Sequence, residues 1–233
     1  KLGINVAVVA ADPEPMFRPL GAEFGRAMRE RHEAKGVKFH MNAKITGYLG
    51  GDKATGVALD TGEEVNGDLV IEAIGSLPNT EWLSGGGLDL HDGVLVDSSM
   101  RATAAGDVSI YAVGDVARYS FDLFDSTPRR IEHWNLPTET GRRAGKSITH
   151  FLNTGEVLAE PVNFVPSFWS DQYEDNVQSF GIPGIADSIN VVDGELAGDC
   201  VVEYLRDGKV VGVVGVNTSV KLAPYRKNFQ ESN

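Results

Sequence analysis

The segment of this sequence best suited to chemistry runs from 109 to 117 and is typical of a β-strand that ends in Gly114 and Asp115. A carboxylate at a strand end can accept a hydrogen bond from a polyol hydroxyl, and a glycine lets a ligand approach the backbone because it has no side chain. A type I turn, with the aspartate capping its own backbone, explains the same residue types equally well. The pattern leaves a polyol site and a plain turn open as alternatives.

Thiol and metal chemistry are disfavoured by the rest of the sequence. The single cysteine, Cys200, excludes an internal disulfide and a Cys-x-x-Cys pair, so electron transfer would need a bound cofactor. Cys200 lies in an apolar stretch, which indicates a small buried hydrophobic residue. The five histidines have no close spacing typical of a zinc ligand set, and we predict no metal site.

Charge and hydropathy narrow the class of protein. The chain has 33 acidic and 21 basic residues and a net charge of −12. This balance disfavours nucleic acid as a partner, because phosphate contacts need a basic surface. No apolar run approaches the roughly 20 residues of a membrane helix, and the start lacks the layout of a signal peptide. We therefore expect no membrane association and a cytoplasmic protein.

The elements that would position the candidate strand begin with an α/β unit. Residues 4–10 are almost continuously apolar, as in a buried parallel strand, and helical periodicity follows at 20–35. Lys1-Leu2-Gly3 is typical of a helix end with Gly3 as its cap, so we expect a strand and a helix upstream and interpret the amino terminus as cut. The sequence then predicts strands at 37–40, 44–49, 54–59 and 68–74, the last ending in Gly75 as strands do beside a nucleotide.

The carboxy-terminal half is predicted to contain a helix, a linker and a small separate domain, in that order. A helix is predicted over 137–152, with Thr138 as a candidate cap, and the proline-spaced stretch 156–166 indicates a linker. Beyond it, Asp207-Gly208 is typical of a hairpin turn within a small separate α+β domain. Short strands are predicted at 93–97, 109–114, 178–182, 188–192, 200–205 and 210–216.

Several of these segments resemble one family. The run 109–117 is similar to the second FAD motif of the pyridine-nucleotide-dependent flavoprotein oxidoreductases, and 73–79 is similar to the turn that leaves their NAD domain. The segments 130–135 and 165–173 resemble the ferredoxin reductase branch of that family. Its disulfide reductases depend on a cysteine pair, which this sequence lacks.

The resemblance implies a fold and a division of the chain. The expected class is α/β: part of a flavoprotein reductase with two dinucleotide-binding domains, plus a carboxy-terminal α+β domain. Residues 1–76 would be the second part of the NAD(P)-binding domain, 77–160 the returning part of the FAD-binding domain, and 161–233 the carboxy-terminal domain.

The same resemblance implies roles for individual residues. Asp115 would bond the ribityl chain of FAD, and the aromatic side chains would hold a planar ring and exclude water. Core packing is the plain alternative for each tryptophan. The implied catalytic residues are Glu132, His133 and Trp134, beside the flavin and the nicotinamide; the implied cofactor-binding residues are Gly75, Pro78, Asn79, Gly114, Asp115 and Val116, with Phe168 and Trp169 at the flavin edge.

Two departures from the family pattern matter. Neither glycine-rich dinucleotide fingerprint is present, because both would precede Lys1, so we expect the chain alone not to bind FAD or to catalyse a reaction. The acidic residue that usually bonds the ribose of NAD at the end of the second strand is replaced by Ala10. Asp12 is within reach, and Arg18 suits a 2′-phosphate. The sequence leans toward NADH over NADPH.

The expected function is electron transfer from NAD(P)H through FAD to a small iron–sulfur ferredoxin, with a homodimer possible. Because ferredoxins are commonly acidic, we expect a local basic patch formed by Arg129, Arg130, Arg142 and Arg143. Two alternatives stay open. One is a flavoprotein similar to apoptosis-inducing factor, against which 168–172 argues; the other is a non-catalytic fragment or dimerisation module without flavin.

Overall fold

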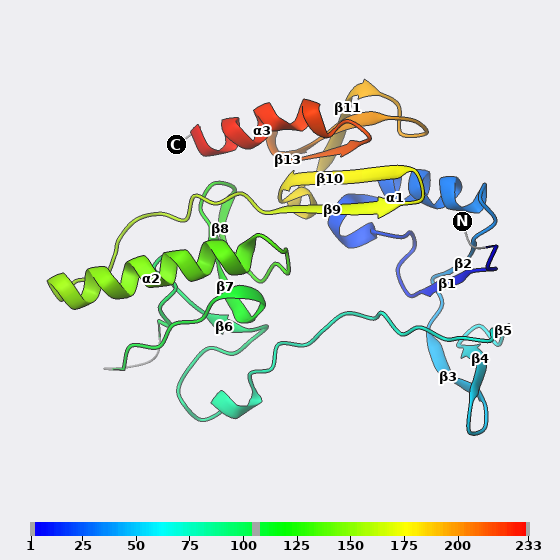
Figure 1. The fold of residues 1–233 in the computed structure, drawn as a ribbon, viewed down its shortest axis with the longest axis horizontal. Helices are drawn as coiled ribbons and strands as arrows, with labels where there is room; N and C mark the ends of the chain where they lie inside the picture. Colours follow the sequence, from blue (N-terminus) through cyan, green and yellow to red (C-terminus); the bar gives the residue numbers. More distant parts are fainter. Residues whose placement is uncertain (1–2, 104–107, 232–233) are drawn as a thin grey trace. The chain divides into compact units, whose positions relative to one another are not determined.

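The computed structural model describes residues 3–103 and 108–231. The chain forms two compact units (Figure 1). The first consists of Lys1–Gly75 with Gly194–Cys200, and the second of Ser76–Asp193 with Val201–Asn233. The helix end expected at Lys1-Leu2 lies outside the described residues.

The first unit opens with a parallel strand pair and its crossover helix. Strands β1 (Ala7–Ala10) and β2 (Lys38–Met41) pair in parallel, and α1 (Phe17–Glu33) connects them. The helix is kinked near its start, where Gly21 has a φ of 78°. Three apolar residues at a spacing of four, Leu20, Phe24 and Met28, form its buried face. The predicted strand–helix–strand unit is confirmed, but the first strand is shorter than expected and is not buried, since Ala7 is exposed and the other three residues are only partly covered.

An antiparallel meander follows in the same unit. Strands β3 (Ile45–Gly50), β4 (Ala54–Leu59) and β5 (Glu64–Asn66) pair in that order. Ala43, Val57 and Leu59 form its small core. The first two strands were expected from the alternation of side chains and from the glycines at their turn, whereas β5 is too short to show a period.

The strand predicted at 68–74 is wrong. Residues 67–80 form no strand and run as an extended loop between labelled elements (Figure 1). Four of its apolar side chains lie outside, since Leu69, Ile71, Ile74 and Leu77 are between 76% and 89% exposed, whereas Val70 packs against the small core of the meander. A strand needs a backbone partner, and within the described residues no strand pairs with this segment. An apolar run alone was therefore insufficient evidence for a strand.

The first part of the second unit contains a three-stranded sheet and the longest helix. Strand β7 (Ala117–Phe121) lies between β6 (Val94–Leu95), which is parallel to it, and the antiparallel β8 (Asp125–Arg129). The short 3₁₀ helix η1 (Glu81–Leu83) precedes them. The core contains Val94, Met100, Tyr119, Phe121 and Leu136.

Two sequence predictions in this region need correction. Residues 109–114 do not form the predicted strand, because their pairing is limited to an isolated bridge between Arg101 and Tyr111. From Gly114 to Val116 the chain forms the 3₁₀ helix η2. The helix predicted at 137–152 exists as α2 (Leu136–Thr154), but Asn135 stands at its amino-terminal cap rather than Thr138. A proline in the first turn explains the start, because it has no N–H to satisfy there.

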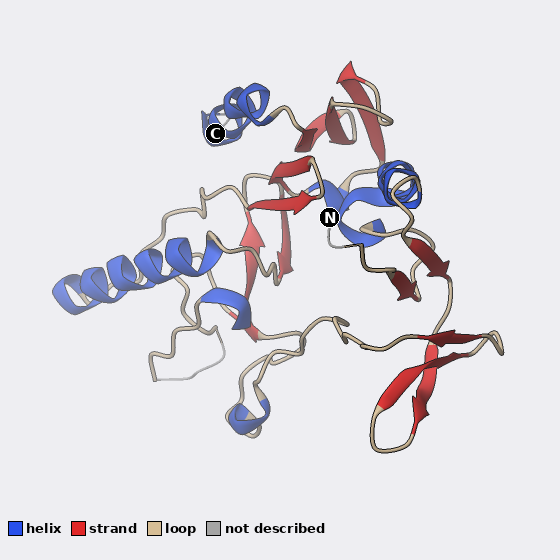
Figure 2. Ribbon diagram, turned by 45° about the vertical axis from the view of Figure 1, so that its right-hand side comes forward, coloured by secondary structure: helices blue, strands red, loops and turns tan. Residues whose placement is uncertain are grey.

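The carboxy-terminal part is a five-stranded antiparallel sheet with one helix packed on it (Figures 1 and 2). The turn Asp207-Gly208 has positive φ at both residues, as predicted for a tight hairpin. Cys200 is fully buried, as expected. The strand order is β11 (Ser188–Gly194), β12 (Cys200–Arg206), β13 (Lys209–Val216), β10 (Asp175–Gly181) and β9 (Ser167–Gln172), with η3 (Pro183–Ile185) and α3 (Ser219–Glu231) completing the chain.

Candidate functional site

The Gly114–Val116 turn is fixed to the first turns of α2. Gly114 has a φ of 69°, a left-handed conformation that glycine adopts without strain. Its N–H donates a hydrogen bond of 2.9 Å to Oγ1 of Thr140, and that hydroxyl donates to the carbonyl of Leu136 at 2.7 Å. Thr140 is fully buried. The turn therefore has one defined orientation at the amino-terminal end of α2.

Asp115, the candidate polyol ligand, is exposed in this turn. Its carboxylate makes no hydrogen bond to any described residue, and only its backbone carbonyl is used, accepting a hydrogen bond from Arg130 at 3.3 Å. The local cap that the sequence left open as an alternative is thus not formed. An exposed strand-end carboxylate beside a glycine has the chemistry that a ribityl hydroxyl would need.

Arg130 connects the turn to the neighbouring carboxylates. Its side chain is only 12% exposed. Besides the carbonyl of Asp115, the guanidinium donates to Oδ1 of Asp92 at 2.8 Å and to Oε1 of Glu132. The fixed fork of an arginine holds its partners at defined angles. Arg130 therefore sets the position of Glu132 relative to Asp115.

Glu132 is held from two sides. The same Oε1 that accepts from Arg130 also accepts a hydrogen bond of 2.7 Å from the hydroxyl of Ser76. These two hydrogen bonds, that of Arg130 foremost, lower the pKa of Glu132. The glutamate side chain remains 40% exposed. It is therefore an oriented, charged acceptor that is open to a ligand.

His133 is the next residue in the sequence and, unlike Glu132, is largely buried and uncharged. Burial lowers the pKa of His133 to about 4, so its ring is neutral at pH 7. The ring packs edge-on against Phe168, with ring centroids 5.3 Å apart. Its Nδ1 is buried and has no hydrogen-bond partner among the described residues. A buried polar atom without a partner marks a place where a bound group can supply one.

The two candidate tryptophans are not part of the core. Trp134 is 85% and Trp169 58% exposed, which removes core packing as the explanation of either residue. Large flat side chains on a surface are suited to contacts with a planar ring. Phe168 and Trp169 are neighbours on β9 and so project from opposite faces of the strand, Phe168 toward His133.

Asn135 joins the start of α2 to the start of β9. Its side-chain amide donates to the carbonyl of Val165 at 3.0 Å and accepts from the N–H of Ser167 at 3.3 Å. This clamp explains why His133 and Phe168, which are far apart in the sequence, meet. Sequence reasoning missed Asn135, Ser76 and Thr140 as positioning residues; an asparagine two residues before Pro137 was the available signal.

The remaining predicted cofactor residues lie in the extended loop. Gly75 ends the first unit and has a φ of 93°. Pro78 and Asn79 belong to the second unit, where the carbonyl of Pro78 accepts a hydrogen bond of 2.9 Å from the N–H of Thr80. Within the described part of the chain, no hydrogen bond joins Pro78 or Asn79 to the Asp115–Arg130–Glu132 network. Any role of these residues stays a prediction.

The expected basic patch does not form. Arg129 is engaged by Asp125, Arg130 lies inside the network above, and Arg143, only 9% exposed, pairs with Glu160 at 3.0 Å. Of the four arginines only Arg142 is largely exposed, with 73% of its side chain accessible. In a chain with 33 acidic and 21 basic residues, each arginine readily finds a carboxylate in its own fold.

Two other expectations concern metals and membranes. Among the residues that the structure describes, no three histidine, cysteine, aspartate or glutamate side chains are grouped closely enough to hold a metal ion. In the same residues, every helix is too short or too polar to cross a bilayer.

The sequence and the fold match those of a family of redox enzymes. Residues 1–141 match the model of the pyridine nucleotide-disulphide oxidoreductases, and the chain belongs to this family. Residues 167–233 match a second model, described as the reductase C-terminal domain. The α/β class and the carboxy-terminal domain that the sequence predicted are thereby confirmed.

Individual relatives point to one branch. The chain is 33% identical to the rubredoxin-NAD(+) reductase of Pseudomonas putida, over 77% of this chain and 44% of that protein. It is 30% identical to a ferredoxin–NAD(P)(+) reductase of Sphingomonas sp, over 94% and 51% of the two chains. A putidaredoxin reductase solved in covalent complex with putidaredoxin superposes with a TM-score of 0.84 at 28% identity, over 98% and 53%. The chain thus spans about half the length of the relatives it matches.

Proposed function

We propose that this chain forms part of an NAD(P)H-dependent, FAD-containing ferredoxin reductase. In this proposal residues 1–76 belong to the NAD(P)-binding domain, 77–160 to the FAD-binding domain and 161–233 to the carboxy-terminal domain. The relatives named above act as ferredoxin or rubredoxin reductases, which supports the assignment. A cytoplasmic location is part of the same proposal.

One observation carries the proposal: the Arg130 guanidinium contacts both the Asp115 turn and the Glu132 carboxylate. A polyol ligand on Asp115 and a ring system beside Glu132 would then be held by one rigid unit of protein. Few ligands need a polyol site and a flat aromatic site side by side, and FAD is one of them. The exposed carboxylate of Asp115 and the buried, unpartnered Nδ1 of His133 both fit such a ligand.

When bound, FAD accepts a hydride and releases electrons singly, which allows a two-electron donor to serve a one-electron acceptor. The chain supplies position and environment. Asp115 would accept hydrogen bonds from the ribityl hydroxyls, and the glycine before it would leave room for close approach. Glu132 is charged and fixed, so it would accept an N–H of the nicotinamide carboxamide and orient that ring. Burial lowers the pKa of His133 to about 4, so its neutral ring is a weak base at pH 7 and a poor acceptor for a proton from the reaction.

The aromatic side chains of the site exclude water from the reacting rings. Phe168 packs against His133, and Trp134 and Trp169 present exposed flat faces. The electron acceptor in the proposal is a small iron–sulfur ferredoxin, and the putidaredoxin reductase of the solved structure is in complex with putidaredoxin. The structure offers this partner no patch made of the four arginines, so docking would use other residues.

The test begins with the purified chain, its intact mass and its visible absorbance after incubation with FAD. In a polypeptide that also contains the two glycine-rich fingerprints, flavin that stays bound through gel filtration, together with NAD(P)H-driven reduction of an added ferredoxin, is the expected result. The 233-residue chain alone should retain no flavin. We expect Asp115→Asn to weaken flavin retention about tenfold, the loss of one hydrogen bond to a charged group. Asp207→Asn, in an exposed turn, is the matched control.

Contrary results separate the alternatives. A polypeptide that contains both fingerprints and still retains no flavin would be a scaffold or a dimerisation module, and its elution volume would show whether two copies associate. Retained flavin without ferredoxin reduction would favour a protein similar to apoptosis-inducing factor. The match of 167–233 to the reductase C-terminal domain argues against that outcome.

A further inference from the structure

The turn that precedes β6 lies against the candidate site. Asp92 and Gly93 end this turn, and both have a positive φ, of 55° and 89°. Strand β6 begins at the next residue, Val94, which pairs with Ala117 at the start of β7. Because the two strands are parallel, Gly93 lies opposite Val116, the last residue of η2.

Gly93 approaches η2 so closely that no side chain fits between them. A Cβ atom added to Gly93 would lie 2.5 Å from the carbonyl oxygen of Val116 and 3.0 Å from Cδ of Arg130. Non-bonded heavy atoms repel each other below about 3 Å, so a side chain at this position would push η2 or Arg130 away. The position of η2, and with it that of Asp115, therefore depends on a glycine in the neighbouring turn.

Asp92 acts on the same site through its carboxylate. Its Oδ1 accepts a hydrogen bond of 2.8 Å from Nε of Arg130. A second nitrogen of that guanidinium, Nη1, donates to Glu132 and to the carbonyl of Asp115. Because a guanidinium is planar and rigid, a partner that holds Nε also fixes the direction of Nη1. Asp92 therefore sets the angle at which Arg130 meets the two candidate ligand-binding residues.

The turn has an anchor of its own. Asp89, at the start of the same loop, accepts a hydrogen bond of 2.7 Å from Nη2 of Arg118 on β7. The backbone carbonyl of Asp89 accepts a second hydrogen bond, of 3.0 Å, from the N–H of Leu95. These contacts fix the turn to the sheet independently of Arg130. A turn that is fixed in this way can hold a neighbouring side chain in place.

A second Asp-Gly turn in the same unit provides a comparison. Asp207 and Gly208, between β12 and β13, also have a positive φ, of 50° and 74°. A Cβ atom on Gly208 would meet no atom within 4 Å. Within the described residues, only the backbone N–H of Asp207 is used, and its carboxylate makes no hydrogen bond or ion pair. The contacts of Asp92 and Gly93 are therefore not a consequence of the turn type.

We propose that Asp92 and Gly93 are positioning residues of the candidate flavin site. Gly93 allows η2 to lie close to the turn, and Asp92 orients Arg130 and, through it, Glu132. The inference rests on the proposed function, which makes Asp115 and Glu132 contacts of the bound cofactors. It adds the residues that hold those contacts in place.

Substitutions at Asp92 separate its carboxylate from its backbone. Glycine and asparagine adopt a positive φ at least as readily as aspartate, so Asp92→Gly and Asp92→Asn both preserve the turn. Asparagine keeps an oxygen acceptor for Nε of Arg130, whereas glycine removes it. If the residue served only the turn, Asp92→Gly would be harmless. If it positions Arg130, Asp92→Gly releases the guanidinium and Asp92→Asn largely restores the wild-type behaviour.

The experiment follows the Nε–H resonance of Arg130 by NMR in the uniformly ¹⁵N-labelled 233-residue chain, without flavin or ferredoxin. Exchange of this proton with water should be about tenfold faster in Asp92→Gly than in the wild type, which corresponds to the loss of one hydrogen bond. In Asp92→Asn the rate should stay close to that of the wild type.

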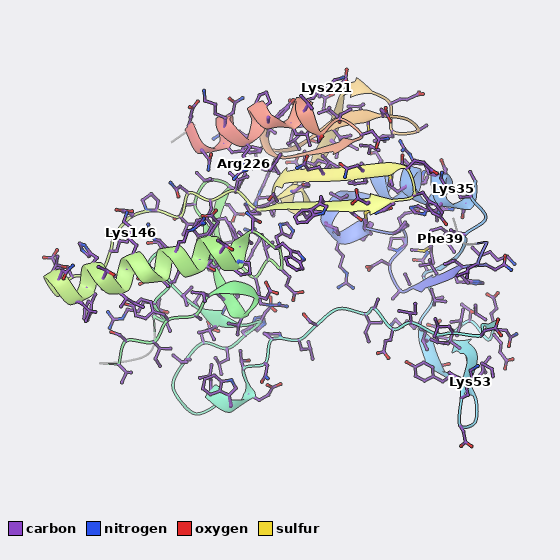
Figure 3. The ribbon with its side chains drawn as sticks, in the orientation of Figure 1. Lys35, Phe39, Lys53, Lys146, Lys221 and Arg226 are labelled. Carbon is purple, nitrogen blue, oxygen red and sulfur yellow. The ribbon has the colours of Figure 1, made fainter. Side chains whose placement is uncertain are left out.

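Two control variants accompany the Asp92 series. Asp207→Gly makes the same change in the comparison turn. Asp193→Asn removes the charge of an aspartate that is 46% exposed, against 49% for Asp92, and that pairs with Lys221 on α3 (Figure 3). Neither control should alter the exchange rate of the Arg130 proton.

Gly93→Ala and Gly208→Ala form a second matched pair. Both place a side chain at a positive φ, and only the first brings it against a carbonyl oxygen. Gly93→Ala should shift the backbone amide resonances of Gly114–Val116, whereas Gly208→Ala should leave them unchanged. If Gly93→Ala does not fold, the Asp92 series still tests the inference, because its substitutions suit the backbone of the turn.

Contrary results are specific to each residue. An Arg130 exchange rate that Asp92→Gly leaves unchanged would overturn the inference for Asp92. Amide resonances of η2 that stay in place in a folded Gly93→Ala variant would overturn it for Gly93. Flavin retention is measured separately, in a polypeptide that contains both glycine-rich fingerprints, so failure here is distinguishable from failure of the proposed function.

Discussion

At the scale of single residues, the site depends on one buried cation. Arg130 touches Asp92, the carbonyl of Asp115 and Glu132, and no lysine can reproduce this because an ammonium group has no planar fork. The residue was visible in the sequence but was assigned to a docking patch. Its burial, which depends on contacts with residues far along the chain, was not readable from its neighbours.

We predict that Arg130→Lys destabilises the chain by about 1 kcal/mol, since it keeps the charge and loses part of the hydrogen bonding to partners that are themselves partly exposed. The free energy of unfolding in urea is the measurement. Arg142→Lys, at an exposed position, should change it by less than about 0.5 kcal/mol. Equal effects at both positions would show that the Arg130 network contributes nothing of its own.

The lowered pKa of His133 predicts that the stability of the chain depends on pH. Its folded pKa is about 4, below the roughly 6.5 of an unfolded histidine. Between these values the unfolded chain binds a proton that the folded chain does not, so stability falls as the pH is lowered from about 6.5 to about 4. The contribution is at most about 3 kcal/mol, since the ring is only partly buried. His133→Phe should remove this component from unfolding measured at a series of pH values; an unchanged pH profile would contradict the burial of the ring.

At the scale of elements, an ion cluster ties the β7–β8 hairpin to the end of β12. Asp125 on β8 is bound by Arg129 four residues on and by Arg206 at 2.5 Å. These contacts, led by the hydrogen bond from Arg129, lower the pKa of Asp125 to about 2. The hairpin is thereby fixed to a strand that lies some eighty residues away in the sequence.

We expect Asp125→Asn to cost about 1–2 kcal/mol of stability at pH 7, which allows for the partial exposure of the cluster. A carboxyl whose folded pKa is lowered stabilises above its unfolded pKa of about 3.9, and this contribution is lost as the pH falls toward 2. The variant and the wild type should therefore converge at pH 2. Arg206→Gln should be measured in the wild type and in the Asp125→Asn variant. The difference between its two effects is the coupling free energy, and we expect Arg206→Gln to have almost no effect when Asp125 is replaced.

The sequence predicted the elements that have local signals. It missed the elements that form only because another segment pairs with or packs against them. The strands β10, β12 and β13 were found within a few residues, because their apolar runs end at turns such as Asp207-Gly208. β9 and α3 were not expected. β9 has mixed polar and aromatic residues and exists because β10 pairs with it, and α3 carries Pro224 in its interior, which breaks the usual helix pattern.

At the scale of the whole molecule, the sequence boundary between the two units, Gly75 to Ser76, falls within the extended loop 67–80. The candidate site could be outlined from the sequence because its residues lie in four short segments that resemble family motifs, 73–79, 109–117, 130–135 and 165–173. The contacts between these segments could not be predicted. They depend on hydrogen bonds of Ser76, Asn135 and Thr140 to residues distant in the sequence, and such bonds leave no periodic pattern.

We predict that limited proteolysis cuts this loop first. Leu69, Ile71, Ile74 and Leu77 are all exposed, and a protease that cleaves beside large apolar residues, such as thermolysin, needs an extended, accessible backbone. Mass spectrometry of early digests should find new termini between 67 and 80. First cuts elsewhere, for example within the β3–β4 hairpin, would show that the loop is protected in solution.

The same loop has a consequence for the behaviour of the protein at high concentration. A row of outward apolar side chains on an extended backbone is a template for pairing with another chain, which is the first step of aggregation. Mutual repulsion between copies that carry a net charge of −12 opposes this encounter. Salt screens that repulsion over about 10 Å at 0.1 M. At low protein and salt concentrations the chain should therefore stay in solution, and at high salt concentration it should aggregate and precipitate.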